Sequence, residues 1–172
     1  EKCGKVAVID HHRKGVGYIQ NPDLVCHEPY SSSASELVTE LLQYVGERDD
    51  KPNRVEAEGL LSGIMLDTRD FTLHTGVRTF EAAAALRRYG AETERVRQLF
   101  DVTMVEYNAK AGLVEKAKMY RNCAISIGGE VAAEARVAIA QAANDLLTIQ
   151  GVDASFVAVQ VGTGVNISAR SL

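Results

Sequence analysis

Residues 5–12 read KVAVIDHH, and this stretch decides how the first half of the chain folds. The four consecutive apolar residues 6–9 are typical of a strand in a parallel sheet that is covered on both faces. Such a strand needs neighbouring strands, and this one lies at the very start of the sequence. We therefore predict an α/β fold and expect partner strands to precede residue 1.

Three polar residues, Asp10, His11 and His12, follow the predicted strand directly. In open α/β sheets, ligands bind beyond the carboxyl ends of the strands. A carboxylate oxygen beside imidazole nitrogens is a ligand set that suits Mn²⁺ better than Ca²⁺. A strand end also cannot easily bury these groups unless they have a polar role. The triplet is our first candidate metal site, with a structural or incidental role as the alternative.

A second candidate, Asp67, follows the apolar run 60–66 and leaves a packed element in the same way. Together with the Asp-His-His triplet it is a candidate bridging carboxylate, whereas alone it reads as a helix end or a turn residue. Further along, His74 and Arg78 lie on either side of Gly76. They could border a cleft, but a solvated loop is the simpler interpretation.

The third candidate lies near the C-terminus, in the stretch VNISARS. Arg170 offers a planar guanidinium fork, and Ser168 and Ser171 offer hydroxyl groups beside it. This combination suits a phosphate group. An exposed arginine on an edge strand is the alternative interpretation.

Helical periodicity predicts three helices between the first and the last of these candidates. The first begins at Ser33, which stands in capping-box spacing with Glu36. The second spans residues 54–66, and the third runs from Thr79 as its N-cap to Gly90 as its stop.

The second helix carries two glycines, Gly59 and Gly63, on one face, which permits close approach of a neighbouring backbone. After the third helix, apolar residues recur at helical spacing over residues 93–120. This pattern predicts one long linker helix, or two helices with a break near Gly112.

The segment 121–172 differs in composition from the part before it. It contains seven charged residues, against 35 in the preceding residues. We predict a second, compact α/β unit here. Its expected elements are strands at 122–127, 155–160 and from 165 onward, a turn at Gly128-Gly129 and a helix over 130–149.

Composition restricts the class of protein further. The 172 residues carry a net charge of −4 and are 46% apolar, which is globular and excludes a disordered tail or a basic nucleic-acid arm. No apolar run approaches the roughly 18 residues that a membrane span needs. The three cysteines, Cys3, Cys26 and Cys123, lie far apart, which indicates reduced thiols in a cytosolic compartment.

The Asp-His-His triplet followed by Asp67 in LDTRDF resembles the DHH–DHHA1 phosphoesterase family. The stretch after Asp67 resembles the branch of that family that acts on cyclic dinucleotides. The similarity extends over nearly the whole chain, in residues 6–15, 31–42, 59–91 and 165–172. The resemblance implies part of a DHH domain in residues 1–92, a linker helix in residues 93–120 and part of a DHHA1 domain in residues 121–172.

The resemblance also implies a two-metal site that holds Mn²⁺ and activates water, so that cyclic-di-AMP is opened to linear pApA. It assigns a role to each candidate residue. His11 would bind one ion, Asp67 would bridge both, His12 would face the scissile phosphate, Asp10 would orient the histidines, and Arg170, Ser168 and Ser171 would hold substrate phosphate.

Two motifs of the family, an HxxxDxD strand end and a GGGH loop, would lie before residue 1 and after residue 172. We therefore expect an incomplete catalytic module, inactive or nearly so by itself, from the cytoplasmic part of a bacterial membrane-anchored protein. Two other functions stay open. One is an oligoribonuclease or phosphoadenosine-phosphate phosphatase of the same family, and the other is a non-catalytic nucleotide-binding module that dimerises through residues 92–120. The isoelectric point of about 5.6 argues against long nucleic acids as partners.

Overall fold

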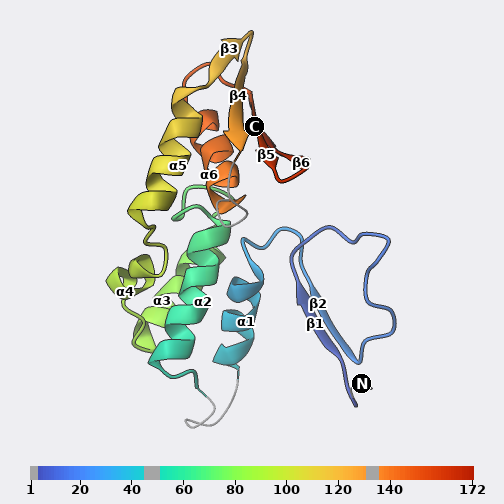
Figure 1. The fold of residues 1–172 in the computed structure, drawn as a ribbon. Coiled ribbons are helices and arrows are strands. Elements are labelled where there is room, and N and C mark those ends of the chain that lie inside the picture. The colour runs from blue at the N-terminus through green and yellow to red at the C-terminus, as the bar shows by residue number, and fades with distance from the viewer. Residues whose placement is uncertain (1–3, 45–50, 131–135) are drawn as a thin grey trace. The chain divides into compact units, whose positions relative to one another are not determined.

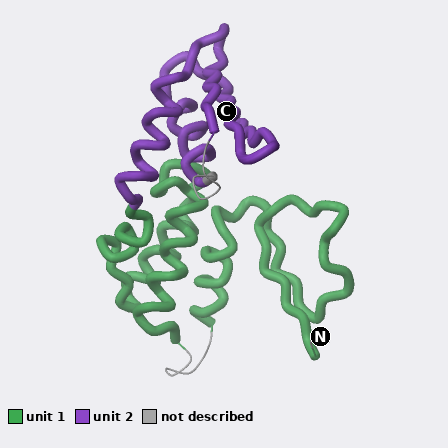
Figure 2. Tube along the Cα trace, in the orientation of Figure 1, with its two compact units in different colours: residues 1–101 green, residues 102–172 purple. Residues whose placement is uncertain are grey.

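A computed structural model describes residues 4–44, 51–130 and 136–172, and the chain divides into two compact units, residues 1–101 and 102–172 (Figure 2). The predicted α/β class is confirmed in both units. The described residues of the first unit form two strands and four helices (Figure 1): β1 (Ala7–Asp10), β2 (Leu24–His27), α1 (Ala34–Gln43), α2 (Arg54–Asp67), α3 (Val77–Arg88) and α4 (Thr93–Gln98).

The strand predicted from KVAVIDHH is β1, and it pairs in parallel with β2 from Ala7 opposite Leu24 to Asp10 opposite His27. The expectation that both of its faces are covered is wrong, because Val8 is buried but Ala7 is exposed. Among the described residues β1 has a single hydrogen-bonded neighbour, β2, and α1 lies close to it. The register matters for function, because it brings the polar ends of both strands to one edge.

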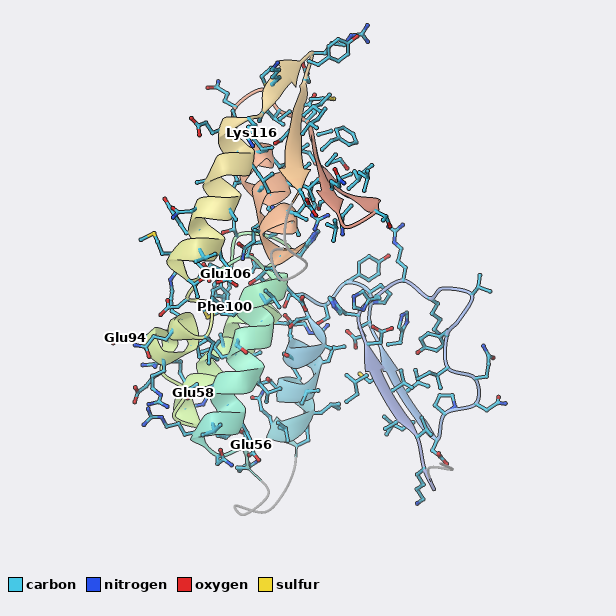
Figure 3. The ribbon with its side chains drawn as sticks, in the orientation of Figure 1. Glu56, Glu58, Glu94, Phe100, Glu106 and Lys116 are labelled. Atoms are coloured by element: carbon cyan, nitrogen blue, oxygen red, sulfur yellow. The ribbon has the colours of Figure 1, made fainter. Side chains whose placement is uncertain are left out.

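The core of the first unit lies between α2, α3 and α4, which pack against one another through small and branched side chains. Its buried members are Ala57, Leu61, Ile64, Met65, Ala82, Leu86, Ala91 and Val96. Helix α2 begins with a capping box in which Asn53 and Glu56 bond reciprocally (Figure 3). This arrangement fixes where α2 starts, and Asp67 is the last residue of the helix.

The other two predicted helix starts have different outcomes. Ser33 caps α1 as expected, because its side chain accepts a hydrogen bond from the backbone N–H of Glu36. The predicted N-cap role of Thr79 is wrong. Gly76 is the cap of α3, and Thr79 lies inside the first turn with its Oγ1 accepting from the Gly76 N–H at 3.1 Å. Gly90, at φ +97°, stops α3 as predicted.

The two glycines of α2 do not share a role. A Cβ atom at Gly63 would collide with the side chain of Ser35 on α1, so this position requires glycine for close helix approach. Nothing lies within 4 Å of a Cβ atom at Gly59. The prediction of close backbone approach is therefore confirmed for Gly63 and wrong for Gly59.

The predicted linker helix over 93–120 is not one helix. It divides into α4, α5 (Met104–Glu115) and β3 (Lys118–Tyr120), and Gly112 lies inside α5 rather than at a break. The chain leaves the helical path before Thr103, which caps α5 in a box with Glu106 (Figure 3). That cap satisfies the first free N–H groups of α5, so a separate helix begins there.

In the second unit, the part that the structure describes forms a four-stranded sheet in the order β3-β4-β5-β6 with two helices, α5 and α6. Its remaining elements are β4 (Cys123–Glu130), α6 (Arg136–Leu147), β5 (Ala154–Val161) and β6 (Gly164–Ser171). β4 and β5 are parallel, and the other two pairs are antiparallel. The buried core residues of the second unit are Leu113, Ala124, Ile139, Ala142, Ala143, Leu146, Val152, Val157 and Val159.

The turn predicted at Gly128-Gly129 is wrong, because both glycines lie inside β4. The pairing with β5 shifts register between Ile127 and Glu130. A Cβ atom at Gly128 would approach the side chains of Leu113 and Val159 to 2.6 and 2.8 Å. The first glycine therefore serves tight packing over an irregular strand rather than chain reversal.

Candidate active site

The Asp-His-His triplet lies at the carboxyl end of β1, as the sequence predicted. The Asp10 carboxylate accepts from the backbone N–H of His12 at 3.0 Å and lies 2.8 Å from its ring Nδ1. The backbone hydrogen bond, followed by the ring contact, lowers the pKa of Asp10 below its ordinary value. A charged Asp10 thus holds the His12 ring, whose side chain is 79% exposed, in one orientation.

His11 and Asp67 come from distant parts of the sequence and meet at one place. The Nε2 atom of His11 lies 3.5 Å from Oδ2 of Asp67. His11 is the less exposed of the two, at 18% against 41%. Its ring also lies 4.4 Å from the ring of His12, measured between centroids. The carboxyl end of β1 and the C-terminal end of α2 therefore place an imidazole and a carboxylate within reach of a shared ligand.

A third histidine, His27, supports this arrangement. Its sequence context favours a loop residue, but it is the last residue of β2. The Nε2 atom of His27 lies 2.6 Å from the backbone carbonyl oxygen of His12. His27 ends β2 directly opposite Asp10. The signal that could have revealed it is a polar residue directly after the short apolar strand LVC, which is the same pattern as in β1.

His11 and Asp67 line a pocket of about 350 Å³ in the first unit. His74, which the sequence marked as a residue that could border a cleft, also lines it. The loop between β2 and α1 forms the rest of the wall, with Pro29, Tyr30, Ser31 and Ser32. The pocket is thus built from a strand end, a helix end and two loops.

A buried carboxylate holds the serine part of this wall. Glu36 is 2% exposed and accepts hydrogen bonds from Ser31 Oγ at 2.9 Å and from Ser32 Oγ at 2.5 Å. Burial favours the neutral acid, but hydrogen bonds from Ser32, Thr79 and Ser31 and the charge of Arg78 outweigh it and lower the pKa of Glu36. Glu36 therefore stays charged and fixes the residues that line the pocket.

Arg78 on α3 clamps the same loop from outside. Its guanidinium donates to Glu28, just after β2, at 2.7 Å, and to both carboxylate oxygens of Glu40 on α1 at 2.7 and 2.6 Å. Hydrogen bonds to Glu40 and then Glu28 raise the pKa of Arg78 further above its ordinary value. The interpretation of Arg78 as a solvated loop residue is wrong, because it lies inside α3. It borders a different hollow, between α1 and α3, and it reaches the wall of the site pocket through Glu28.

The segment after Asp67 has an unusual backbone. Four of its residues have a backbone φ between +47° and +61°, a region that residues other than glycine rarely adopt: Arg69, Asp70, Phe71 and His74. Thr68, fully buried, holds this segment: its Oγ1 donates to the Ile64 carbonyl at 2.7 Å and accepts from the Phe71 N–H at 3.0 Å. The strained segment carries His74 to the pocket.

The remaining predicted site residues belong to the second unit. Ser168 and Arg170 share one face of β6, since residues two apart along a strand point the same way, whereas Ser171 lies on the other face. The Nε of Arg170 donates to Asn144 on α6 at 3.0 Å. The three residues are therefore neighbours in sequence but do not present one common surface.

Within residues 4–44, 51–130 and 136–172, no group of three or more His, Cys, Asp or Glu side chains is arranged to hold a metal ion. None of the helices described in those ranges is both long and apolar enough to pass through a bilayer. His11 and Asp67 remain a pair of candidate ligands that border an open pocket.

Comparison with known proteins agrees with this geometry. Residues 1–64, which contain the Asp-His-His triplet and most of α2, match the N-terminal domain of the DHH family. The whole chain is 50% identical to the cyclic-di-AMP phosphodiesterase GdpP of Geobacillus thermodenitrificans, over 99% of its length. Over its first 64 residues the chain is therefore similar to the DHH family.

Two further curated proteins show a similar level of identity. The chain is 47% identical to GdpP of Bacillus subtilis and 43% identical to the cyclic-di-AMP phosphodiesterase PdeA of Listeria monocytogenes, over 99% and 100% of its length. It spans about a quarter of these curated relatives, 26% of each. Among solved structures, an exopolyphosphatase-related protein from Bacteroides fragilis matches 98% of the chain with a TM-score of 0.83. The chain spans 51% of that protein, and at 22% identity this likeness concerns the fold alone.

Proposed function

We propose that this chain is part of the catalytic region of a phosphodiesterase that hydrolyses cyclic-di-AMP to pApA. The observation that carries the proposal is the meeting of His11 and Asp67, 3.5 Å apart, in a pocket beyond the carboxyl end of β1. The names of the curated relatives supply the substrate class. The pocket supplies the side chains that a phosphate ester and its metal ions would meet.

The two candidate ligands fit a divalent cation such as Mn²⁺. Nitrogen and oxygen ligands bind such ions at about 2.0–2.2 Å. Atoms 3.5 Å apart can therefore both reach one ion. When bound, two such ions would polarise the phosphate and activate water. The described residues supply two ligands, so we expect residues 1–172 alone to act far more slowly than the full-length protein.

The neighbouring residues have distinct roles in this proposal. His12 is the group that faces the scissile phosphate, because Asp10 binds its Nδ1 and leaves the other side of the ring outward. Asp10 is a positioning residue, since it acts through His12. Arg170, Ser168 and Ser171 stay predicted contacts to substrate phosphate, and Arg170→Ala tests this by its effect on KM.

The decisive experiment measures turnover of cyclic-di-AMP by the full-length protein with Mn²⁺, together with calorimetric titration of the metal. Asp67→Asn should lower kcat/KM by more than about 100-fold, because loss of even an outer partner of a metal ligand costs about 10–100-fold. Its melting temperature should stay close to that of the wild type, since Asp67 is 41% exposed. The matched control is Asp101→Asn, which removes an exposed carboxylate of the same unit that does not line the pocket.

Wild-type activity in Asp67→Asn, with unchanged Mn²⁺ binding, would end the catalytic assignment. Parallel assays with pApA and a short RNA test the substrate. Faster turnover of the RNA would move the protein to the oligoribonuclease alternative. Binding of cyclic-di-AMP without turnover by the full-length protein would leave a nucleotide-binding module.

A further inference from the structure

Tyr30 is the most exposed aromatic side chain among the described residues, at 99%, and it lines the pocket that holds His11 and Asp67. It lies in the loop between β2 and α1, two residues after Glu28. Leaving an aromatic ring in water forgoes the stabilisation that its burial would give. At the mouth of a polar pocket, that ring calls for a functional explanation.

The backbone on both sides of Tyr30 is held in place. Before it, Glu28 is bound by Arg78 at 2.7 Å and its carbonyl accepts from the Ser31 N–H at 3.1 Å. After it, Ser31 and Ser32 are anchored on the buried Glu36. The loop thus holds the backbone of Tyr30 in a fixed position, which lowers the entropy lost when a ligand stacks on its ring.

The chemistry of the pocket indicates what would cover the ring. Its floor offers a nitrogen ligand and a carboxylate for a cation, and with it for a phosphate. Its rim offers a flat apolar face. A ligand that matches both is a nucleotide, with its phosphate at the floor and its base against the rim, because every base has a π-face that stacks on aromatic side chains.

We propose that Tyr30 stacks on a nucleobase of the substrate whose phosphate lies at His11 and Asp67. The inference rests on the proposed function and adds a specificity-determining residue to it. A protein that recognised a phosphate ester alone would need no such ring. With it, the site favours substrates that carry a base one sugar away from the reacting phosphate.

The test compares Tyr30→Ala and Tyr30→Phe in the full-length protein, using steady-state hydrolysis of cyclic-di-AMP. Tyr30→Ala should raise KM about 10-fold with kcat nearly unchanged, since stacking on one base corresponds to roughly 5- to 150-fold in affinity. Tyr30→Phe keeps the ring and should stay within about 2-fold of the wild type. Tyr44→Ala, at an 88% exposed tyrosine of the same unit that does not line the site pocket, is the matched control.

A second readout does not depend on turnover. A phosphorothioate analogue of the dinucleotide with 2-aminopurine in place of one adenine should lose fluorescence on binding to the wild type and to Tyr30→Phe. The loss should be absent in Tyr30→Ala. Because Tyr30 is exposed, a melting curve should show that Tyr30→Ala folds. If it does not, Tyr30→Leu replaces it as the variant without an aromatic ring.

The outcomes separate the two proposals. An unchanged KM and unchanged quenching in Tyr30→Ala, with turnover still lost in Asp67→Asn, overturn the stacking role and leave the phosphodiesterase standing. An equal rise in KM for Tyr44→Ala also overturns it. No turnover of cyclic-di-AMP by the wild type, with quenching that still depends on Tyr30, overturns the phosphodiesterase and leaves a base-binding site.

Discussion

The two units of the chain handle buried polar groups in different ways. Among the described residues, eight buried polar or charged residues belong to the first unit and two to the second. The first set comprises Ser31, Ser32, Ser33, Glu36, Thr39, Glu58, Thr68 and Thr79, and the second comprises Ser126 and Ser155. In the second unit each serine simply donates to a backbone carbonyl, of Leu113 or Ala143, at 2.6 Å.

In the first unit Thr39 and Thr68 also donate to backbone carbonyls, of Ser35 and Ile64 at 2.7 Å, but other buried polar groups are joined to charged side chains. Glu36 binds two serines of the pocket wall, and Glu58 on α2 (Figure 3) pairs with Arg54 at 3.0 Å and with Arg95 at 3.2 Å. Buried networks of hydrogen bonds and ion pairs fix side-chain positions more strictly than apolar contacts do. The loss of one residue from such a network therefore destabilises the fold more. Both units have an apolar core, but among the described residues only the first unit also buries carboxylates, those of Glu36 and Glu58.

Deleting Glu36 is the strongest test of that comparison. Glu36→Ala should lower the free energy of unfolding by about 3 kcal/mol, because it leaves buried hydroxyls without their acceptor and opens a cavity. Ser155→Ala in the second unit should cost about 1 kcal/mol, the value of an ordinary hydrogen bond. Chemical denaturation of both variants measures the difference. Equal losses would remove the distinction between the units.

Acidification should lower the stability of the first unit by less than the Glu36→Ala substitution does, because it protonates hydrogen-bonded carboxylates without removing them. The pKa values of Asp10, Glu36 and Glu58 in the first unit are lowered, as is that of Glu106 in the second. A carboxylate with a lowered folded pKa contributes stability above its unfolded value, about 4. That stability is lost as pH falls through the folded value.

Three such groups lie in the first unit, so the amides of α1–α3 should lose hydrogen-exchange protection below about pH 4 before those of α5 and α6. Residue-resolved exchange at a series of pH values measures this order. Glutamine does not titrate, so in Glu36→Gln the two units should lose protection at pH values that lie closer together. Simultaneous loss of protection in both units would contradict the prediction.

The smallest expected effect concerns the two glycines of α2. Gly63→Ala should destabilise by about 1–2 kcal/mol, because the added methyl group collides with Ser35 and forces α1 and α2 apart. Gly59→Ala should instead stabilise by about 0.5–1 kcal/mol, since alanine is the better helix former and meets no neighbour. Thermal unfolding of both variants measures whether each change raises or lowers stability. If both change stability in the same direction, α1 does not constrain α2 at Gly63.

Much of the site could be predicted because its residues lie at the ends of strongly patterned elements. The apolar run before Asp10 and the run before Asp67 located two element ends correctly, and the structure brings them together. The role of His27 was missed although it follows LVC as Asp10 follows its apolar run, because its partner, the His12 carbonyl, is set by the pairing of β1 with β2. The role of Glu36 was missed because capping-box spacing pairs it with Ser33, whereas its carboxylate binds Ser31 and Ser32. The start of α5 was readable, since Thr103 and Glu106 stand in capping-box spacing, but continuous apolar periodicity concealed it.

The backbone between Asp67 and Gly76 has a consequence for the order of folding. The left-handed backbone of Arg69, Asp70, Phe71 and His74 costs about 1–2 kcal/mol for each residue. An isolated peptide of this sequence would therefore not adopt this backbone conformation. The hydroxyl of Thr68 that stabilises it is buried only once α2 has packed. We therefore expect the wall that carries His74 to take its shape only once α2 has packed.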